Sequence, residues 1–344
     1  MKSKPTNPEV DVIIVNYNAG TMLRDCVAAL AAQDMENFRV FLIDNASSDG
    51  SIEALPPLDD RFEVISLDDN TGFAKGNNIG VTRGSAPWIA LLNPDAYAAP
   101  DWLRQLLKAA QTDPSIVMAG STQIDANQRH LLDGAGDLYA PTGFAWRGLW
   151  HHPIERLPDT GEVFGPCAAA ALYRRDAFEA ANGLDEDFFC YHEDVDLSFR
   201  LRLAGGRAIQ VREAVVYHEG SGVAGAQSPF AVFHGTRNRT WTFFKTMPLP
   251  LLVLFLPFHV ILLCGFIARA LVKGQFRPTI TGVWASLTGL NKIIKKRPAV
   301  QASRSIGLWQ LLQSFTWSPA TFLCRRADVR PWRQKPSLEK FVKN

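Results

Sequence analysis

Ile89-Ala90-Leu91-Leu92-Asn93-Pro94-Asp95-Ala96 is the stretch that decides the fold. Its four apolar residues, 89–92, predict a buried strand of a parallel sheet. Pro94 must end the strand because it has no N–H for the ladder. Asp95 is then expected just past the carboxyl end of a central strand, where open α/β sheets bind ligands and where a carboxylate can hold a divalent cation. Residues 93–95 are also typical of a plain turn, and this stretch alone leaves both interpretations open.

Further apolar runs predict strands at residues 10–15, 40–43, 62–65 and 116–119. Helical spacing between them predicts alternating strands and helices, and so βαβ units and a parallel sheet. The first four strands end in loops rich in Asn, Asp and Gly, which should lie along one sheet edge and suit a nucleotide. Neither GxGxxG after the first strand nor GxxxxGK[ST] anywhere is present, so the sequence favours neither a dehydrogenase nor a P-loop protein.

A second informative stretch is residues 188–200, FFCYHEDVDLSFR. Glu193 and Asp194 are expected to open a helix, where acidic residues commonly complement the helix dipole. The crowding of three acids within four residues can also create a general base. Arg200 can pair with Asp196 one turn earlier. A further strand, 208–217, is expected to end at His218, which is a metal-ligand candidate only if Asp95 lies nearby.

The composition predicts one large α/β domain with a smaller appendage: the chain has 344 residues, 47% hydrophobic and 20% charged. The five cysteines show no CxxC spacing, so neither a zinc site nor a disulfide framework is indicated. His151 and His152 could bind a metal, but without a third ligand at a fixed spacing a surface loop is favoured. Residues 1–9 lack the apolar core of a secretory signal, which predicts a cytoplasmic setting.

The charge is divided unevenly along the chain. Residues 245–344 contain 16 lysines and arginines against two acidic residues, a net charge of +14, whereas residues 1–244 carry −12. Residues 247–268 hold no formally charged side chain and are long enough to span a bilayer, although Pro248, Pro250 and Pro257 make a clean spanning helix less favourable. Basic segments with tryptophans suit a lipid interface. The alternative is an ordinary hydrophobic C-terminal subdomain.

Five ordered motifs connect the chain to a known family. They are residues 12–18 (VIIVNYN), 43–51 (IDNASSDGS), 70–78 (NTGFAKGNN), 91–96 (LLNPDA) and 192–200 (HEDVDLSFR). The sequence resembles the inverting glycosyltransferases of family 2, which have the GT-A fold, and within them the rhamnosyltransferase-like branch, over about residues 8–240. The resemblance implies an α/β nucleotide-sugar-binding domain at residues 1–240, with a mostly parallel sheet flanked by helices, and a basic helical membrane-association region at 241–344.

The resemblance also implies roles for individual residues. Asp194 would be the catalytic base, and Asp95 with His218 would hold Mg²⁺ or Mn²⁺. The family has aspartate at the first position of its DxD motif, whereas this chain has Asn93, which weakens the metal site by one charge. The residues expected to bind the donor are Asn16, Asn18, Asp44, Asn77 and Asn93, with Asp44 holding the nucleotide base.

The expected reaction is an inverting transfer of one sugar, such as L-rhamnose from a dTDP-sugar, onto a lipid-linked or cell-surface glycan. Processive synthases carry a QxxRW motif that is missing here, which argues against a long polymer. The expected partners are a nucleotide-diphosphate sugar, the glycan or lipid-linked acceptor and the inner face of the cell membrane, and not nucleic acid. Two alternatives remain: a nucleotidylyltransferase acting on sugar phosphates, and a non-catalytic membrane adaptor with a transferase-like fold.

Overall fold

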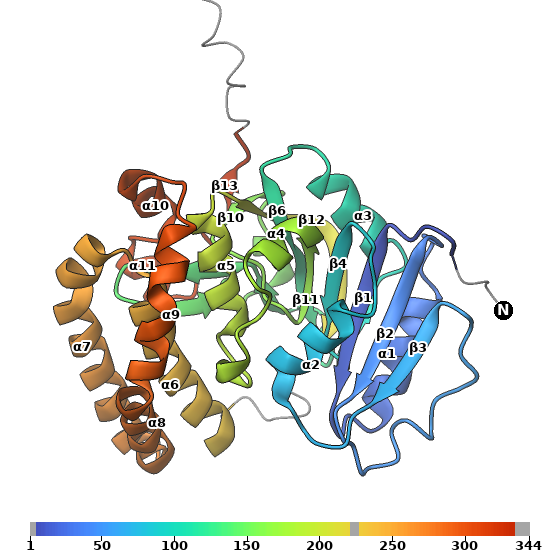
Figure 1. Ribbon diagram of the computed structural model, residues 1–344, viewed down its shortest axis with the longest axis horizontal. Helices are drawn as coiled ribbons and strands as arrows, with labels where there is room; N and C mark the ends of the chain where they lie inside the picture. The colour runs from blue at the N-terminus through green and yellow to red at the C-terminus, as the bar shows by residue number, and fades with distance from the viewer. Residues whose placement is uncertain (1–4, 221–226, 334–344) are drawn as a thin grey trace, which may run out of the picture.

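A computed structural model describes residues 5–220 and 227–333 of the chain. Ser221 and Gly222, which the sequence places in the loop after His218, lie outside the described residues. A central sheet forms the middle layer, and helices cover both of its faces (Figure 1). The predicted α/β architecture with a C-terminal helical region is therefore confirmed.

The sheet has the strand order β13-β10-β12-β6-β11-β4-β1-β2-β3, with β5 added beside β12 and β7 beside β6. Its parallel core, β3-β2-β1-β4, contains the first four predicted strands. The sheet is mixed: β11 runs antiparallel between β4 and β6, and β5, β7, β10 and β13 also pair antiparallel with their neighbours. The strands are β1 Val10–Asn16, β2 Phe38–Asp44, β3 Phe62–Ser66, β4 Trp88–Leu92, β5 Ala96–Ala98, β6 Ile116–Asp125, β7 Leu132–Ala135, β8 Asp137–Tyr139, β9 Ala145–Arg147, β10 Gly161–Val163, β11 Ala170–Arg174, β12 Arg207–His218 and β13 Arg330–Pro331.

Two apolar layers hold the helices against the sheet. One face packs against α1 and α3, whose buried residues include Leu23 and Trp102. The other face packs against α2, α4 and α5, with Phe178 and Leu197 among the residues buried there. The helices of this part are α1 Thr21–Ala31, α2 Gly72–Val81, α3 Trp102–Ala110, α4 Arg175–Ala180 and α5 Glu193–Leu203, with short 3₁₀ turns at Ile154–Arg156 and Glu186–Phe188.

The C-terminal helices pack against the outer side of α5. A third apolar cluster joins Phe199 of α5 to Phe243, Leu251 and Phe315. These helices are α6 Pro229–Thr246, α7 Leu249–Val272, α8 Phe276–Thr288, α9 Leu290–Ala302, α10 Leu308–Ser314 and α11 Pro319–Leu323. The proposed domain boundary at residue 240 stays a prediction, and α6 runs across it without a break.

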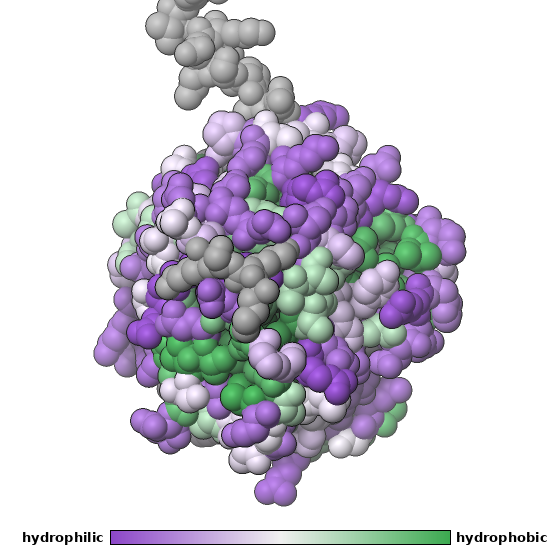
Figure 2. All heavy atoms as spheres, turned by 90° about the vertical axis from the view of Figure 1, so that its right-hand side faces the viewer, coloured by the Kyte–Doolittle hydropathy of each residue, from purple (hydrophilic) through white to green (hydrophobic). Residues whose placement is uncertain are grey.

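Helix α7 contains most of the uncharged run. It extends unbroken through Pro257 and is long and apolar enough, by length and composition, to cross a membrane. Only 17% of its most apolar window is buried within the protein. On the opposite side of the molecule, hydrophilic residues cover most of the surface, with a few apolar patches (Figure 2). The apolar exterior of α7 thus distinguishes the C-terminal helices from that opposite surface.

Candidate active site

A cleft of about 870 Å³ opens where the parallel strands end. It brings together residues from both of the stretches on which the sequence analysis rested, 89–96 and 188–200. Its described lining comes from the loops after β1, β2, β3 and β4, the start of α2, the end of β9, the segment before β11, the loop before α5 with the start of that helix, the end of β12 and the start of α6. The polar and charged groups in it are Tyr17, Asn18, Asn45, Asn70, Asn93, Asp95, Arg147, Cys167, Tyr191, His192, Glu193, Asp194, His218 and Ser228.

Asp95 and His218 meet at the bottom of this cleft. Strand β5 pairs with β12 so that Ala96 lies opposite His218, which brings Asp95 beside the histidine. The His218 Nε2 atom lies 3.2 Å from Oδ1 of Asp95, and both side chains are almost fully buried. Asn93 contributes its amide, with Nδ2 3.5 Å from the same Nε2 atom. The Oδ1 atom of Asn93 is buried and has no hydrogen-bond partner among the described residues.

Asp133 holds the other side of the histidine. The Nδ1 atom of His218 donates to Oδ2 of Asp133 at 2.7 Å, and Arg147 donates to the same oxygen. A carboxylate on the second ring nitrogen is the usual way in which a metal-binding histidine is oriented. The sequence analysis did not identify Asp133 or Arg147, because they lie in an irregular region of the sequence. The antiparallel pairing of β7 with β6 brings Asp133 to the site.

The charges around His218 favour its protonated form. Burial by itself would lower the pKa of His218, but Asp95 and Asp133 raise it to about 9. Burial likewise opposes the ionisation of Asp133, yet Arg147 and His218 lower the pKa of that carboxyl to about 2. The protonated ring of His218 therefore places a positive charge between the carboxylates of Asp95 and Asp133. A bound divalent ion would satisfy the same charge arrangement.

Asp194 lies at the start of α5, facing the same cleft. Its Oδ2 accepts from the Ala168 N–H at 3.1 Å and its Oδ1 from the Val195 N–H at 2.8 Å. Burial raises the pKa of Asp194, and these N–H groups with Arg147 offset part of that effect. The predicted pairing of Asp196 with Arg200 is also present, at 2.8 Å.

Asp137 is the second carboxyl near Asp194. The ligand atoms of Asp137, Cys167 and Asp194 lie within 4.8 Å of one another, and Arg147 donates to the Cys167 sulfur at 3.1 Å. Burial and the neighbouring Asp194 raise the pKa of Asp137 well above its usual range. Among the described residues, Asp194 lines the cleft and Asp137 does not. Of the two, Asp194 is therefore the carboxyl that can reach a substrate.

The residues expected to bind the nucleotide of the donor do not all line the cleft. Asn18 lines the cleft and accepts from the Ser48 N–H at 2.8 Å. Asn16 instead donates to Asp44 Oδ1 at 3.1 Å, and Asn77 donates to the Phe73 carbonyl of its own helix at 2.9 Å. Asn16, Asp44 and Asn77 are absent from the described lining of the cleft, so their donor-binding roles remain predictions.

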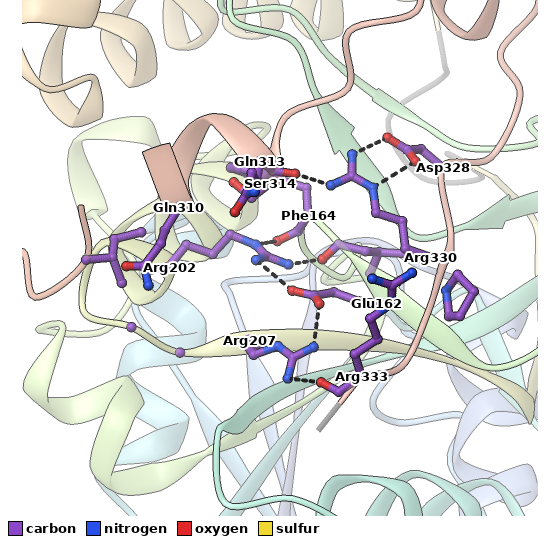
Figure 3. Close-up of a pocket in the computed structure, with 15 residues that line it drawn as sticks. Glu162, Phe164, Arg202, Arg207, Gln310, Gln313, Ser314, Asp328, Arg330 and Arg333 are labelled. Carbon is purple, nitrogen blue, oxygen red and sulfur yellow. Dashed lines mark hydrogen bonds and ion pairs between the residues drawn. The ribbon is translucent and has the colours of Figure 1, made fainter. Parts of the chain in front are cut away.

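A second cavity, of about 620 Å³, lies between β10, β12 and the C-terminal segment (Figure 3). Glu162 bridges Arg202 at 3.2 Å and Arg207 at 2.5 Å, while Arg330 pairs with Asp328 at 2.6 Å. These charged side chains already have partners within the protein. The ion pairs attach the C-terminal segment to the sheet, and none of their side chains is left free to bind a ligand.

The paired histidines and the cysteines can now be placed in the structure. The Nε2 atom of His152 lies 2.7 Å from the Cys324 carbonyl oxygen, as in the favoured surface-loop interpretation. All five cysteines lie in the part of the chain that the structure describes, and each is a free thiol. In the same described ranges, neither paired histidine belongs to a group of three or more potential metal ligands.

Comparison with known proteins adds the family context. The model of the family described as glycosyl transferase family 2 matches residues 11–181. An N-acetylglucosaminyl-diphospho-decaprenol L-rhamnosyltransferase of Mycobacterium tuberculosis is 30% identical over 230 residues, which cover 60% of this chain and 75% of that protein. An N-acetylglucosaminyltransferase of Rhizobium sp. is 33% identical over 230 residues, covering 60% of this chain and 48% of that protein.

A solved structure supports the fold. The mannosyltransferase of Pyrobaculum calidifontis, determined in complex with GDP-Man and Mn²⁺, superposes with a TM-score of 0.52 at 16% identity. The alignment covers 88% of this chain and 87% of that protein. The similarity confirms the GT-A-like arrangement of a central sheet with flanking helices.

Proposed function

This chain belongs to glycosyl transferase family 2, in its rhamnosyltransferase-like part, and from this premise we propose that it transfers one L-rhamnosyl group from a dTDP-sugar to a lipid-linked glycan. The observation that carries the proposal is the arrangement of the cleft. Asp95 and His218, 3.2 Å apart, and Asp194 all face one cavity at the ends of the parallel strands. Family membership favours glycosyl transfer over the nucleotidylyltransferase and adaptor alternatives.

The choice of donor and acceptor rests on the relatives. The Mycobacterium tuberculosis protein is named for L-rhamnosyl transfer to a sugar on a diphosphate-linked polyprenol. The Rhizobium relative is instead named for N-acetylglucosaminyl transfer. We take the first as the pattern for this chain because the alignment covers more of that protein, 75% against 48%.

The residues fit a divalent cation. A carboxylate oxygen of Asp95 and an imidazole nitrogen of His218 converge on one point, and the buried Asn93 Oδ1 beside them is without a partner among the described residues. Such O and N ligands suit Mn²⁺ and also Mg²⁺. Asp95 and His218 would hold the ion, and its positive charge would offset the charge of the leaving diphosphate.

In the proposed reaction, the acceptor hydroxyl attacks the anomeric carbon from the side opposite the diphosphate. Asp194 takes the hydroxyl proton as the new C–O bond forms. The bond between the anomeric carbon and the diphosphate oxygen breaks, and nucleoside diphosphate leaves with that electron pair. Configuration at the anomeric carbon inverts in this single displacement, so no nucleophilic side chain is required.

The proposed location of the protein is the inner face of a membrane. The strongly exposed apolar side chains lie on the C-terminal helices, where Val253 and Ile261 of α7 are 66% and 67% exposed and Trp284 of α8 is 68% exposed. Part of the basic charge counted in the sequence is already used within the protein, since Lys292 and Lys296 pair with Asp185 and Asp187. The apolar surface is therefore the main support for membrane association.

The test is a product assay with the full-length protein. dTDP-L-rhamnose and UDP-N-acetylglucosamine are each supplied with Mn²⁺ and a polyprenyl-diphosphate-linked N-acetylglucosamine. We expect a rhamnosylated lipid product with inverted configuration and release of dTDP. Release of pyrophosphate would instead identify a nucleotidylyltransferase, and product from UDP-N-acetylglucosamine alone would reassign the donor.

A further inference from the structure

The backbone immediately before Asp194 has an uncommon conformation. Phe189, Tyr191 and His192 have φ values of 64°, 69° and 67°. A positive φ costs a non-glycine residue free energy, most of all a bulky one, and it persists only where surrounding contacts enforce it. His192 is also the N-cap of α5 and makes no side-chain capping bond. Some other element must therefore hold this loop in place.

That element is α6, through the side chain of Asn238. The two hydrogens on its Nδ2 are shared among three loop carbonyls, which lie 2.9 Å (Phe188), 2.9 Å (Cys190) and 2.7 Å (Tyr191) away. The orientation of the amide is fixed from the other side because Nε of Arg237 donates to Oδ1 of Asn238 at 2.8 Å. Asn238 is fully buried.

The opposite side of the loop packs against residues 70–78, the motif predicted to help bind the donor. The Ala74 N–H donates to the Phe189 carbonyl at 3.1 Å. Gly72, at φ 82°, packs so closely that a Cβ there would lie 2.5 Å from the Phe189 ring. The carbonyls of residues 188–191 are thus all bonded, three of them to the one amide of Asn238.

Three ion pairs, the two of Lys245 buried and that of Lys296 partly exposed, extend the same attachment to the ends of the loop. Lys245 of α6 lies 2.6 Å from Asp185, which precedes the loop, and 2.8 Å from Asp196 in the first turn of α5. Lys296 of α9 lies 2.5 Å from Asp185. Helices α6 and α9 therefore fix both ends of the segment that leads into Asp194.

We propose that Asn238 is a positioning residue for catalysis, which holds the strained loop 188–192 so that Asp194 faces the acceptor hydroxyl. This inference rests on the proposed role of Asp194 as the base. Its consequence is that the C-terminal helices are part of the catalytic apparatus in addition to providing a surface for a membrane. Asn238 is absent from the described lining of the cleft, so it acts on the reaction through the loop, without itself touching the reacting atoms.

The test compares Asn238→Ala with Thr246→Val in the full-length protein. Thr246 is buried in the same helix, and in the part of the chain that the structure describes its hydroxyl donates to the Thr242 carbonyl, so this control loses a hydrogen bond of α6 without affecting the loop. We expect Asn238→Ala to lower kcat by about 10²-fold, as for a base displaced by about 1 Å. Binding of dTDP with Mn²⁺, measured by calorimetry, should stay unchanged. Equal loss of kcat in both variants, or none in Asn238→Ala, would overturn the proposal.

A double-mutant cycle separates positioning from general destabilisation. In an Asp194→Asn background, Asn238→Ala should have little further effect on the residual rate, because the group that it positions is already gone. A full additional loss would show that Asn238 does not act through Asp194. If Asp194→Asn alone keeps wild-type turnover, the base assignment fails. If it is impaired while Asn238→Ala is not, only the present inference fails.

Should Asn238→Ala fail to fold, Arg237→Gln provides the second route. It removes the donors to Oδ1 of Asn238 and to the Phe188 carbonyl, 2.8 Å and 2.9 Å away, from a residue that is not fully buried. We expect a smaller loss of kcat in the same direction, with dTDP binding retained. Wild-type kcat in folded Arg237→Gln, together with an unfolded Asn238→Ala, would assign Asn238 to folding alone.

Discussion

His218 and Asp133 form a short, buried contact beside the proposed metal site, with Nδ1 of the histidine donating to Oδ2 of the aspartate at 2.7 Å. This bond leaves Nε2 directed at Asp95. It also fixes the ring, because rotation of His218 would break a buried charge-assisted hydrogen bond. Asp133 thus sets the orientation of the His218 ring relative to Asp95, the other candidate ligand. Asp133 belongs to none of the sequence motifs.

Metal dependence is the first prediction. Asp95→Asn should abolish most turnover and weaken Mn²⁺ binding, because it removes the only ionised carboxylate proposed as a ligand. Binding is measured directly by electron paramagnetic resonance of free Mn²⁺, and EDTA should stop the wild-type reaction. Full turnover in metal-free buffer would contradict the assignment of Asp95 and His218 as a metal site.

The second prediction concerns Asp133. Asp133→Asn should lower Mn²⁺ affinity by about 10- to 100-fold, as expected for the loss of a carboxylate that orients a histidine ligand. The control is Asp125→Asn, since within residues 5–220 and 227–333 the Asp125 side chain accepts from the backbone N–H groups of its own turn, those of Asn127 and Gln128. Equal Mn²⁺ affinity in both variants would show that Asp133 has no orienting role.

The third prediction distinguishes catalysis from helix capping at Asp194. Asp194→Asn should keep dTDP binding and lose about 10²- to 10⁴-fold in kcat, the usual contribution of a general base. If Asp194 were only a cap of α5, asparagine would serve about as well and turnover would barely change. Single-turnover rates in the folded variant decide between the two roles.

The sequence predicted the parts of this site that lie at strand and helix ends. Asp95 follows a run of apolar residues that forms a strand, and Asp194 lies in the first turn of a predicted helix, so their places could be inferred from chain order and the topology of parallel strands. Asp133 and Arg147 could not, because the antiparallel pairing of β7 with β6 brings in Asp133 and a separate two-stranded sheet, β8-β9, carries Arg147, both from an irregular stretch of the sequence. Asn77 is a different case: its amide donates to the Phe73 carbonyl of its own helix, and its role in donor binding stays a prediction.

The contact between the C-terminal helices and the loop before Asp194 was also beyond sequence reasoning. Lys292 and Lys296 were counted as part of a basic attachment region because the excess of positive charge suggested a membrane. In the structure they pair with Asp185 and Asp187, more than 100 residues earlier in the chain. Net charge along a segment does not distinguish cations that face lipid from cations that hold the fold.

A fourth prediction uses one of those pairs to test stability against pH. Burial alone would raise the pKa of Asp185, but Lys245 and Lys296 hold it well below the usual 3.8. Its stabilising effect is therefore complete above about pH 4 and is lost as the pH falls toward the folded-state pKa. Asp185→Asn should cost about 2 kcal/mol of unfolding free energy at pH 7, and the difference from wild type should shrink below pH 4.

Urea unfolding at several pH values measures this difference. Asp176→Asn is the matched control, because the Asp176 side chain is 71% exposed in its pair with Arg174 and such pairs contribute little. A deficit in Asp185→Asn that stays constant from neutral to acidic pH would show that the carboxylate charge is not what stabilises the fold.

The last prediction is that α7 and α8 bind a lipid surface mainly through apolar side chains. Val253 and Ile261 are 66% and 67% exposed, and moving such a side chain out of water is worth about 1.5–3 kcal/mol. Val253→Glu with Ile261→Glu should therefore release the protein from vesicles of phosphatidylethanolamine and phosphatidylglycerol. Val64→Glu, on β3 across the molecule, replaces a 37% exposed valine and should leave binding unchanged. Salt should release the wild type only in part, because screening acts on charges and not on apolar contacts. Wild-type protein that stays in the supernatant at low salt would make the C-terminal helices an ordinary subdomain.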